Sequence, residues 1–253
     1  MNVGIDPGLL AGFLLALVRT SAWVAVTPPF SNGAIPGRVK VLLAAGLSVS
    51  VAPQLDYDPS IYEIPNFLAA VAYQTITGLA LGFVVYLVFA VVQAAGELID
   101  LQAGFSAAQL YDPFTQAAAT PIGRLYQLVA LAILFAINGH LLLVRGFLRS
   151  FEAAPLGGVD FDRMSVVVTS NLGNFLVSAM EIAAPLLAAL FLAEIVLGML
   201  TKAAPQVNIL QIGFIAKILM ALLMVGLAMP LLPEVIRSLT DRSIRLGDAI
   251  VGG

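Results

Sequence analysis

Two long apolar runs near the middle of the chain constrain its fold more than any other feature. FLAAVAYQTITGLALGFVVYLVFAVVQAA ends just before Gly96, and LYQLVALAILFAINGHLLLVRGF begins at Leu125. Each run can cross a hydrocarbon core about 30 Å thick at about 1.5 Å per helical residue. The chain is 60% hydrophobic and 11% charged, whereas soluble domains are about 25% charged. The sequence therefore predicts an all-α integral membrane protein.

Composition excludes several classes of function. The chain has no cysteine and a single histidine, His140, which excludes thiolate chemistry and a metal site with several histidine ligands from this chain. Its net charge is −3 and it has no basic run, which argues against nucleic-acid binding. It lacks a GxxxxGK[ST] phosphate loop. We therefore expect no metal and no cofactor.

The apolar segments predict about six helices, broken by Pro and Gly into helical hairpins. Leu9–Val26 is predicted as the first helix, and Val41–Ala52 is short enough to be a partial span. Leu125–Phe151 is predicted as one helix. Ser165–Leu200 is too long for an ordinary span, so a kinked helix or a two-part hairpin is expected at Pro185. The last segments are an apolar helix at Phe214–Leu232 and a C-terminal stretch, RSLTDRSIRLGDAIVGG, expected at the surface.

The stretch GELIDLQAGFSAAQLYDPFTQAAATP, from Gly96 to Pro121, separates the two long runs. It keeps aromatic and aliphatic side chains among small residues, and Asp112-Pro113 interrupts any helix. Non-helical backbone at membrane depth is tolerated only where protein buries it or where it lines a water-filled cavity. The sequence therefore predicts an internal non-helical loop that forms a pore, a plug or a buried site.

Charged residues occur at or near membrane depth, and they are costly in lipid unless they pair, face a cavity or meet a partner subunit. They are Arg19, Glu97, Asp100, Glu181, Glu194, Lys202 and Lys217. For Arg19 alone, the simplest interpretation is a side chain that snorkels to the lipid headgroups. Together, however, the seven indicate a protein that is not surrounded only by lipid. Recurrent small residues, including Gly78 and Gly82, indicate closely packed helices.

Two other classes of function fit the sequence less well. Gly104-Phe105-Ser106-Ala107 approaches the Gly-x-Ser-Gly pattern of rhomboid-type intramembrane proteases, with His140 as the base. The fourth position is alanine, and a packing or helix-capping serine explains the match equally well. A secondary transporter would use Pro-broken helices for a midplane site, but two matching broken segments are not evident in the two halves.

Three stretches, taken together, resemble the family of the flagellar export component FliR and its virulence-system counterpart SctT. They are VRTSAWVAVTPPFSNGAIPGRVKVLLAAGLSVSVAP, then GELIDLQAGFSAAQLYDPFTQ, then TKAAPQVNILQIGFIAK, in the family's order. The resemblance extends over essentially the whole chain. It implies a single-copy subunit of the type III export gate, which assembles with FliP and FliQ, lies beside FlhB and FlhA, and passes unfolded flagellar proteins.

The resemblance also implies a division of the chain and roles for named residues. Residues 1–253 would form one domain, with a FliP-like part at 1–164 and a FliQ-like part with a short tail at 165–253. Residues 104–121 would form the plug of the pore, with gating residues Gly104, Phe105, Ser106, Leu110, Tyr111, Asp112, Pro113 and Phe114. Structural or intersubunit charges would be Arg19, Arg38, Glu97, Asp100, Glu194, Lys202 and Lys217. A turn at the cytoplasmic end would include Pro205, Gln206 and Asn208.

The resemblance thus implies a non-enzymatic channel subunit in the bacterial inner membrane, at the flagellar basal body. The expected mechanism is steric, because a flexible apolar loop excludes water and ions when it is closed and an entering chain displaces it. A virulence-type export gate is the principal alternative.

Overall fold

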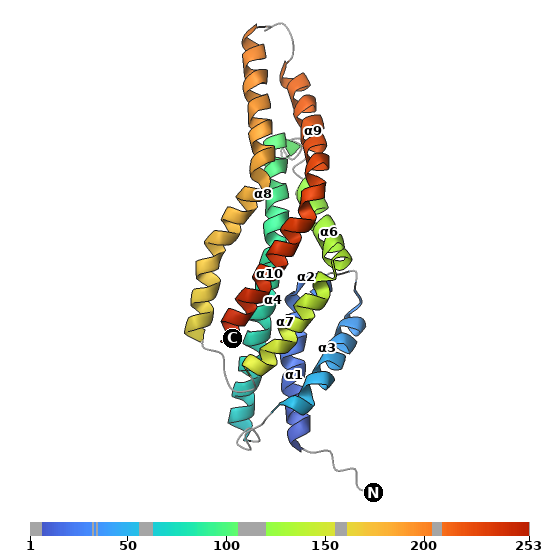
Figure 1. Cartoon of the computed structure of the whole chain (residues 1–253), viewed down its shortest axis with the longest axis vertical. Helices are drawn as coiled ribbons and strands as arrows, with labels where there is room; N and C mark the ends of the chain where they lie inside the picture. The colour runs from blue at the N-terminus through green and yellow to red at the C-terminus, as the bar shows by residue number, and fades with distance from the viewer. Residues whose placement is uncertain are drawn as a thin grey trace. The chain divides into compact units, whose positions relative to one another are not determined.

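The computed structural model describes residues 7–31, 33, 35–55, 63–105, 120–154, 161–203 and 209–252 (Figure 1). These residues form helices and contain no strand, which confirms the all-α class. The helices are α1 (Pro7–Val26), α2 (Pro28–Ser31), α3 (Gly37–Val51), α4 (Ile64–Ala103), α6 (Pro121–Ala136), α7 (Gly139–Ala153), α8 (Phe161–Ala203), α9 (Ile209–Ala228) and α10 (Leu232–Val251). Short 3-10 turns occur at Ala52–Gln54 and Met229–Leu231.

Four stretches of helix are long and apolar enough to cross a membrane. They are Pro7–Val26, Ile64–Ala103, Met164–Ala203 and Ile212–Val251, and α6 with α7 would add a fifth if together they form one span. At 15 residues, α3 is shorter than the roughly 20 residues that a spanning helix needs. The chain is therefore a polytopic membrane protein that also contains helices shorter than a full span.

The helices form two compact units. The first comprises Met1–Val88, Asn138–Leu172 and Arg237–Gly253, and the second comprises Phe89–Ile137 and Gly173–Ile236. α4, α8 and α10 are long enough to contribute residues to both units. The predicted division into a FliP-like and a FliQ-like part is based on resemblance to other proteins. The two units are defined by contacts within the chain and do not test that division, so it stays a prediction.

The first unit is organised around aromatic rings between α1 and α7. The ring centroids of Trp23 and Phe147 lie 4.4 Å apart in a stacked arrangement, and Phe147 meets Phe151 edge-on at 5.5 Å. α4 approaches α1 closely at Gly78 and Gly82, where an added Cβ would meet the α1 backbone. The predicted close packing through small residues is therefore confirmed here.

The second unit has a mainly aliphatic core drawn from α4, α6 and α8. Val92 and Ile99 of α4, Ile122 and Leu134 of α6, and Leu190 of α8 are each at most 1% exposed. Side chains of this shape fill the space between helices at close to crystal density, so even small changes in their volume are destabilising.

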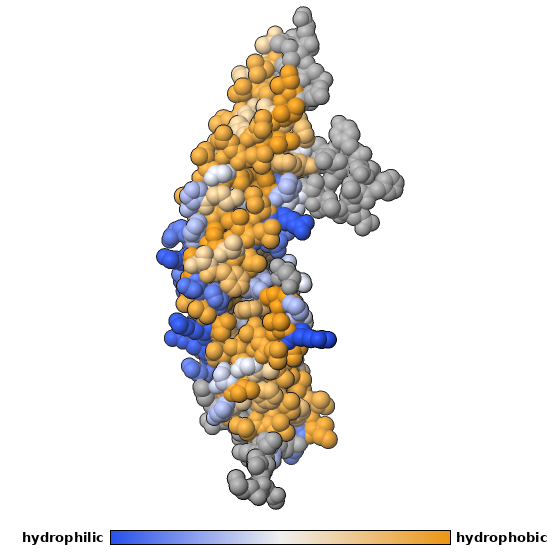
Figure 2. Space-filling model, turned by 90° about the vertical axis from the view of Figure 1, so that its right-hand side faces the viewer, coloured by the Kyte–Doolittle hydropathy of each residue, from blue (hydrophilic) through white to orange (hydrophobic). Residues whose placement is uncertain are grey.

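Much of the remaining apolar surface is exposed, and the face shown in Figure 2 is largely hydrophobic. In the most apolar 18-residue stretch of Met164–Ala203, only 17% of the residues are buried. In the most apolar 18-residue stretch of Ile64–Ala103, 61% are buried. Leu176 and Met199 of α8 are 67% and 68% exposed. Patches of this kind mark surfaces for lipid or for other protein subunits.

Two sequence-based expectations about the helices are wrong, and for a third one of its two alternatives is excluded. The loop does not begin at Gly96, because α4 continues to Ala103; the helix-breaking Asp112-Pro113 lies farther along the chain. Leu125–Phe151 is two helices, because Asn138 adopts φ 57°, a left-handed conformation that asparagine tolerates better than most residues. α8 passes through Pro185 without a break, so of the two predicted alternatives only the two-part hairpin is wrong.

The C-terminal stretch differs from expectation as well. Instead of lying wholly at the surface, it belongs to α10, whose buried residues include Leu239, Thr240, Ser243 and Ile250. Charged residues such as Arg237 and Asp241 occupy the exposed positions of the same helix. This amphipathic pattern permits one face to pack while the other remains polar.

Candidate functional site: the ends of the central loop

The central loop leaves α4 through a glycine in the left-handed region. Gly104 has φ 92°, and its N–H donates to the carbonyls of Asp100 (3.1 Å) and Leu101 (3.3 Å). Glycine is favoured at such helix ends because it adopts positive φ without a Cβ penalty. Phe105, the next residue, is half-buried. The conformation at Gly104 therefore sets the direction in which the loop departs.

The ring of Phe214 on α9 lies directly against Gly104. An added Cβ at Gly104 would lie 2.9 Å from Cε2 and 3.3 Å from Cδ2 of this ring. A side chain here would thus meet both backbone strain and steric overlap. Phe214 was not among the predicted site residues, and only its spatial position beside the glycine identifies it.

Gly104→Ala is expected to destabilise the end of α4 by about 1–2 kcal/mol, the typical cost of the left-handed conformation for a residue with a Cβ. The measurement is the thermal unfolding midpoint of the purified chain in detergent. Gly173→Ala is the matched control, because no atom lies within 4 Å of its added Cβ. Combining Gly104→Ala with Phe214→Ala removes the steric overlap and leaves the backbone strain. Equal midpoints for Gly104→Ala and the control would contradict the assignment.

The loop ends at the first turn of α6, and the side chain of Asp100, on α4, binds this turn. Its Oδ1 accepts the N–H of Ile122 at 3.1 Å, and its Oδ2 accepts the N–H of Gly123 at 2.9 Å. The first N–H groups of a helix lack partners within the helix, and the helix dipole favours a negative charge beside them. Thr120, at the N-cap position, makes no side-chain capping hydrogen bond. A carboxylate on α4 therefore caps α6 from 22 residues away.

Two glycines bring the backbones of α4 and α6 together beside this cap. An added Cβ on Gly96 would lie 2.6 Å from the Cα of Gly123, and one on Gly123 would lie 2.8 Å from the Cγ of Glu97. Glu97 also accepts a hydrogen bond of 2.8 Å from the Gln93 amide through its Oε1. The crossing and the carboxylate cap together form what we call the loop anchor, consisting of Gly96, Asp100, Ile122 and Gly123.

A polar cluster links α4, α8 and α9 in the same unit. The Lys217 ammonium lies 3.6 Å from Oε1 of Glu194, and the Gln102 amide donates to Oε2 of Glu194 at 2.9 Å. Lys217 is 17% exposed and Glu194 is 55% exposed, so solvent or a partner reaches the acidic side. The predicted charges Glu194 and Lys217 are therefore in contact with each other.

In the first unit, Arg19 caps the C-terminal end of α7. Its guanidinium donates to the carbonyls of Ser150 (2.9 Å) and Ala154 (2.7 Å) and to the amide oxygen of Gln74 (2.6 Å). It also lies 4.3 Å from the ring centroid of Phe151. A cation at a helix C-terminus is stabilised by the free carbonyls and the dipole. Arg19 is fully buried, so the snorkelling interpretation is wrong.

The other predicted site residues are divided between described and undescribed parts of the chain. Arg38 and Lys202 are exposed, and neither forms an ion pair within the described residues. The gating residues Ser106, Leu110, Tyr111, Asp112, Pro113 and Phe114 and the turn residues Pro205, Gln206 and Asn208 lie outside the described residues, and their roles stay predictions.

Sequence reasoning missed several partners of the predicted residues. Gln74 is a buried amide within a long apolar run, and that contrast was a detectable signal of a polar contact. Gly123 follows the helix-starting Pro121 and lies opposite Gly96. Ser150 gave no signal in the sequence, because the group that contacts Arg19 most closely is the backbone carbonyl of Ser150, which every residue type has.

These features define a polytopic helical membrane protein. Its long helices can span a membrane, its buried charged side chains cap helix ends, and its internal loop is anchored. Comparison with known proteins gives the family. The family model of bacterial export proteins, family 1, matches residues 10–243, and the chain belongs to this family, which includes the flagellar biosynthetic protein FliR.

The relatives are similar over most of their length. FliR of Bacillus subtilis (strain 168) is 31% identical, over 100% of this chain and 99% of that protein. FliR of Escherichia coli (strain K12) is 30% identical, over 85% of this chain and 83% of that protein. The surface presentation of antigens protein SpaR of Shigella sonnei is 28% identical, over 78% and 77%. The chain is therefore a membrane-embedded subunit of the type III export gate.

Proposed function

We propose that this chain joins FliP and FliQ to form the flagellar export channel, and that residues 104–121 are its plug. The observation that supports the plug most directly is the loop anchor. Asp100 and the Gly96–Gly123 crossing hold together the two helices that carry the ends of the loop. A segment fixed at both ends can occupy a pore and be displaced without separating the helices that hold it.

The proposed gating mechanism is steric and hydrophobic. When the loop fills the pore, its apolar side chains exclude water and so exclude ions as well, since hydrophobic constrictions gate by dewetting. An entering unfolded chain displaces the loop toward the wall of the pore. The left-handed Gly104, with Phe214 beside it, sets the direction from which the loop swings.

The charged residues have structural roles in this proposal. Glu194, Lys217 and Gln102 hold three helices in register, because each contact joins a different pair of helices. The exposed Arg38 and Lys202 remain available to neighbouring subunits, and the turn at 202–208 would face the cytoplasmic entrance near FlhB and FlhA. One copy of this chain is expected in each inner-membrane complex. No catalytic residue is assigned.

A flagellar rather than a virulence-type gate is favoured by the comparisons. The FliR relatives from Bacillus and Escherichia are 31% and 30% identical over at least 85% of this chain, whereas SpaR is 28% identical over 78%. We therefore propose unfolded flagellar axial proteins as the cargo.

Deleting residues 104–120 is expected to make cells leak ions when the chain is co-expressed with FliP and FliQ. The physical reason is that an open pore wide enough for a polypeptide no longer contains an apolar barrier. The measurement is ion influx in cells, with assembly of the complex checked on a native gel. Gly104→Ala in the same assay shows whether strain at the loop's origin is sufficient for leakage. An assembled complex that does not leak would overturn the plug assignment.

A further inference from the structure

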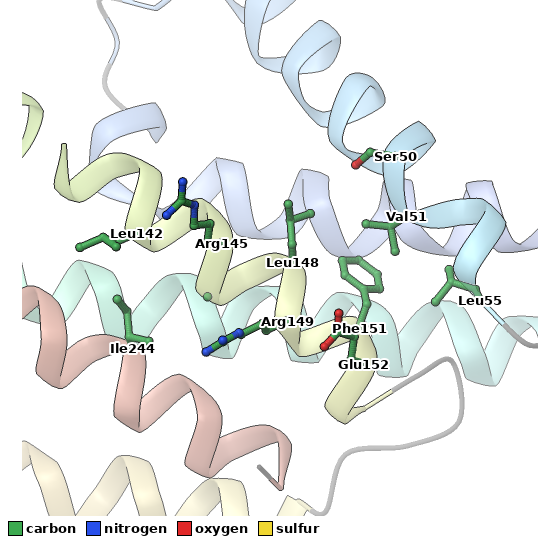
Figure 3. A pocket seen from close by; sticks show the side chains of 11 residues that line it. Ser50, Val51, Leu55, Leu142, Arg145, Leu148, Arg149, Phe151, Glu152 and Ile244 are labelled. Atoms are coloured by element: carbon green, nitrogen blue, oxygen red, sulfur yellow. The ribbon is translucent and has the colours of Figure 1, made fainter.

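A cleft of about 690 Å³ lies in the first unit, between α3, α7 and α10. Its lining includes Ser50 and Val51 of α3, Arg145 and Arg149 of α7, and Ile244 of α10 (Figure 3). This volume lies within the range of small-molecule sites, which is about 300–1,000 Å³. The residues of the loop anchor belong to the other unit and are not among the residues that line the cleft.

The charge of the cleft is positive. Arg145 and Arg149 are one helical turn apart on α7 and are both exposed, so they lie on the same side of the helix. Within the described residues, neither guanidinium forms an ion pair or a hydrogen bond. The acidic residue of the lining is Glu152, and it makes no ion pair with them. Two cations thus face one anion in a chain whose net charge is −3.

The rest of the lining is mostly hydrocarbon. Leu142, Leu148 and Ile244 form walls beside the arginines, and Val51 and Leu55 lie across from them. The adjoining surface of α3 is also apolar, because Val49, next to Ser50 in the chain, is 60% exposed. The cleft therefore combines anion-binding groups with surfaces that suit acyl chains.

We propose that this cleft binds an anionic phospholipid, with the phosphate at Arg145 and Arg149 and an acyl chain along the leucine and valine side chains. Guanidinium groups bind phosphate oxygens through strong charge-assisted hydrogen bonds. Basic pockets between membrane helices bind such headgroups. An extended acidic peptide would satisfy the arginines, but its own backbone polar groups would find few partners against these apolar walls.

Native mass spectrometry of the full chain, released from nanodiscs of phosphatidylcholine with or without phosphatidylglycerol, tests the proposal. We expect one phosphatidylglycerol to be retained by the wild type and its affinity to fall at least about tenfold in Arg145→Gln/Arg149→Gln. Arg38→Gln/Arg237→Gln is the matched control, since both arginines are exposed and lie outside the cleft. Equal retention by the two double variants would overturn the site.

A second measurement does not depend on the folding of the double variant. The chain has no cysteine, so Ser50→Cys and the exposed Ser238→Cys each introduce a single thiol. We expect phosphatidylglycerol vesicles, compared with phosphatidylcholine vesicles, to slow maleimide labelling at position 50 and not at position 238. Protection by inorganic phosphate alone would show a simple anion site and overturn the acyl-chain part. Protection only after co-purification with partner subunits would identify a protein interface and overturn the lipid site.

Discussion

Arg19→Ala is expected to abolish stable folding of the chain in the membrane. The guanidinium is fully buried and makes hydrogen bonds to Gln74, Ser150 and Ala154. Each buried acceptor that loses its donor costs about 1–3 kcal/mol, and the truncation also leaves a cavity. The combined loss, about 3 kcal/mol or more, is a large fraction of the stability of a typical protein. The measurement is the yield and thermal midpoint of detergent-purified protein.

Arg19→Lys tests the geometry separately from the charge. Lysine keeps the cation but lacks the planar fork that reaches several acceptors at once, so an intermediate midpoint is expected. Arg38→Ala is the control, because it removes the same charge from an exposed position at the start of α3. If Arg19→Ala were as stable as this control, the capping of α7 would contribute little to the fold.

Asp100→Ala is expected to have the second-largest effect, which is to weaken the loop anchor and increase ion leakage through the channel. Without the carboxylate, the N–H groups of Ile122 and Gly123 lose their acceptors, which are otherwise within 3.1 Å and 2.9 Å. The loss of an N-cap typically costs about 0.5–2 kcal/mol, and burial of this site adds to that cost. The loop would then be less firmly held, so ion leakage from the assembled complex should rise.

The leakage assay for Asp100→Ala uses the same co-expressed complex as the loop deletion. Asp241→Ala is the matched control, because Asp241 is exposed on α10 and lies outside the loop anchor. Asp100→Asn should leak less than Asp100→Ala, since its amide oxygen still accepts one N–H while its amide nitrogen cannot accept the other. If the Asp100→Ala complex were stable and assembled but leaked no more than the wild type, the loop anchor would have no role in gating.

These two residues show that the costly charges of this membrane protein stabilise helix ends. Asp100 accepts N–H groups at the beginning of α6, and Arg19 donates to carbonyls at the end of α7. In each case the sign of the charge opposes that of the helix dipole at that end. Free backbone groups at a helix end have no water to bind within a membrane, so such caps are more important there than in a soluble protein.

The class of the protein and its family follow from the amino-acid sequence alone. Its apolar runs require helices, because only helices and closed barrels satisfy the backbone within lipid. Its motifs predicted the family that the comparisons confirmed. The charged positions Arg19, Asp100, Glu194 and Lys217 were also recognisable, since charges in apolar runs are rarely without a structural or functional role.

The residues that those charges contact, and the positions at which the helices end, are evident only in three dimensions. Arg19 meets Ser150 from 131 residues away and Gln74 from 55, and Asp100 meets Gly123 from 23. No local pattern specifies such pairs, because they depend on how helices pack. The same reason explains the continuation of α4 to Ala103: buried contacts made by Ile99 and Ala103, both 0% exposed, favour a helix where the sequence suggested a loop.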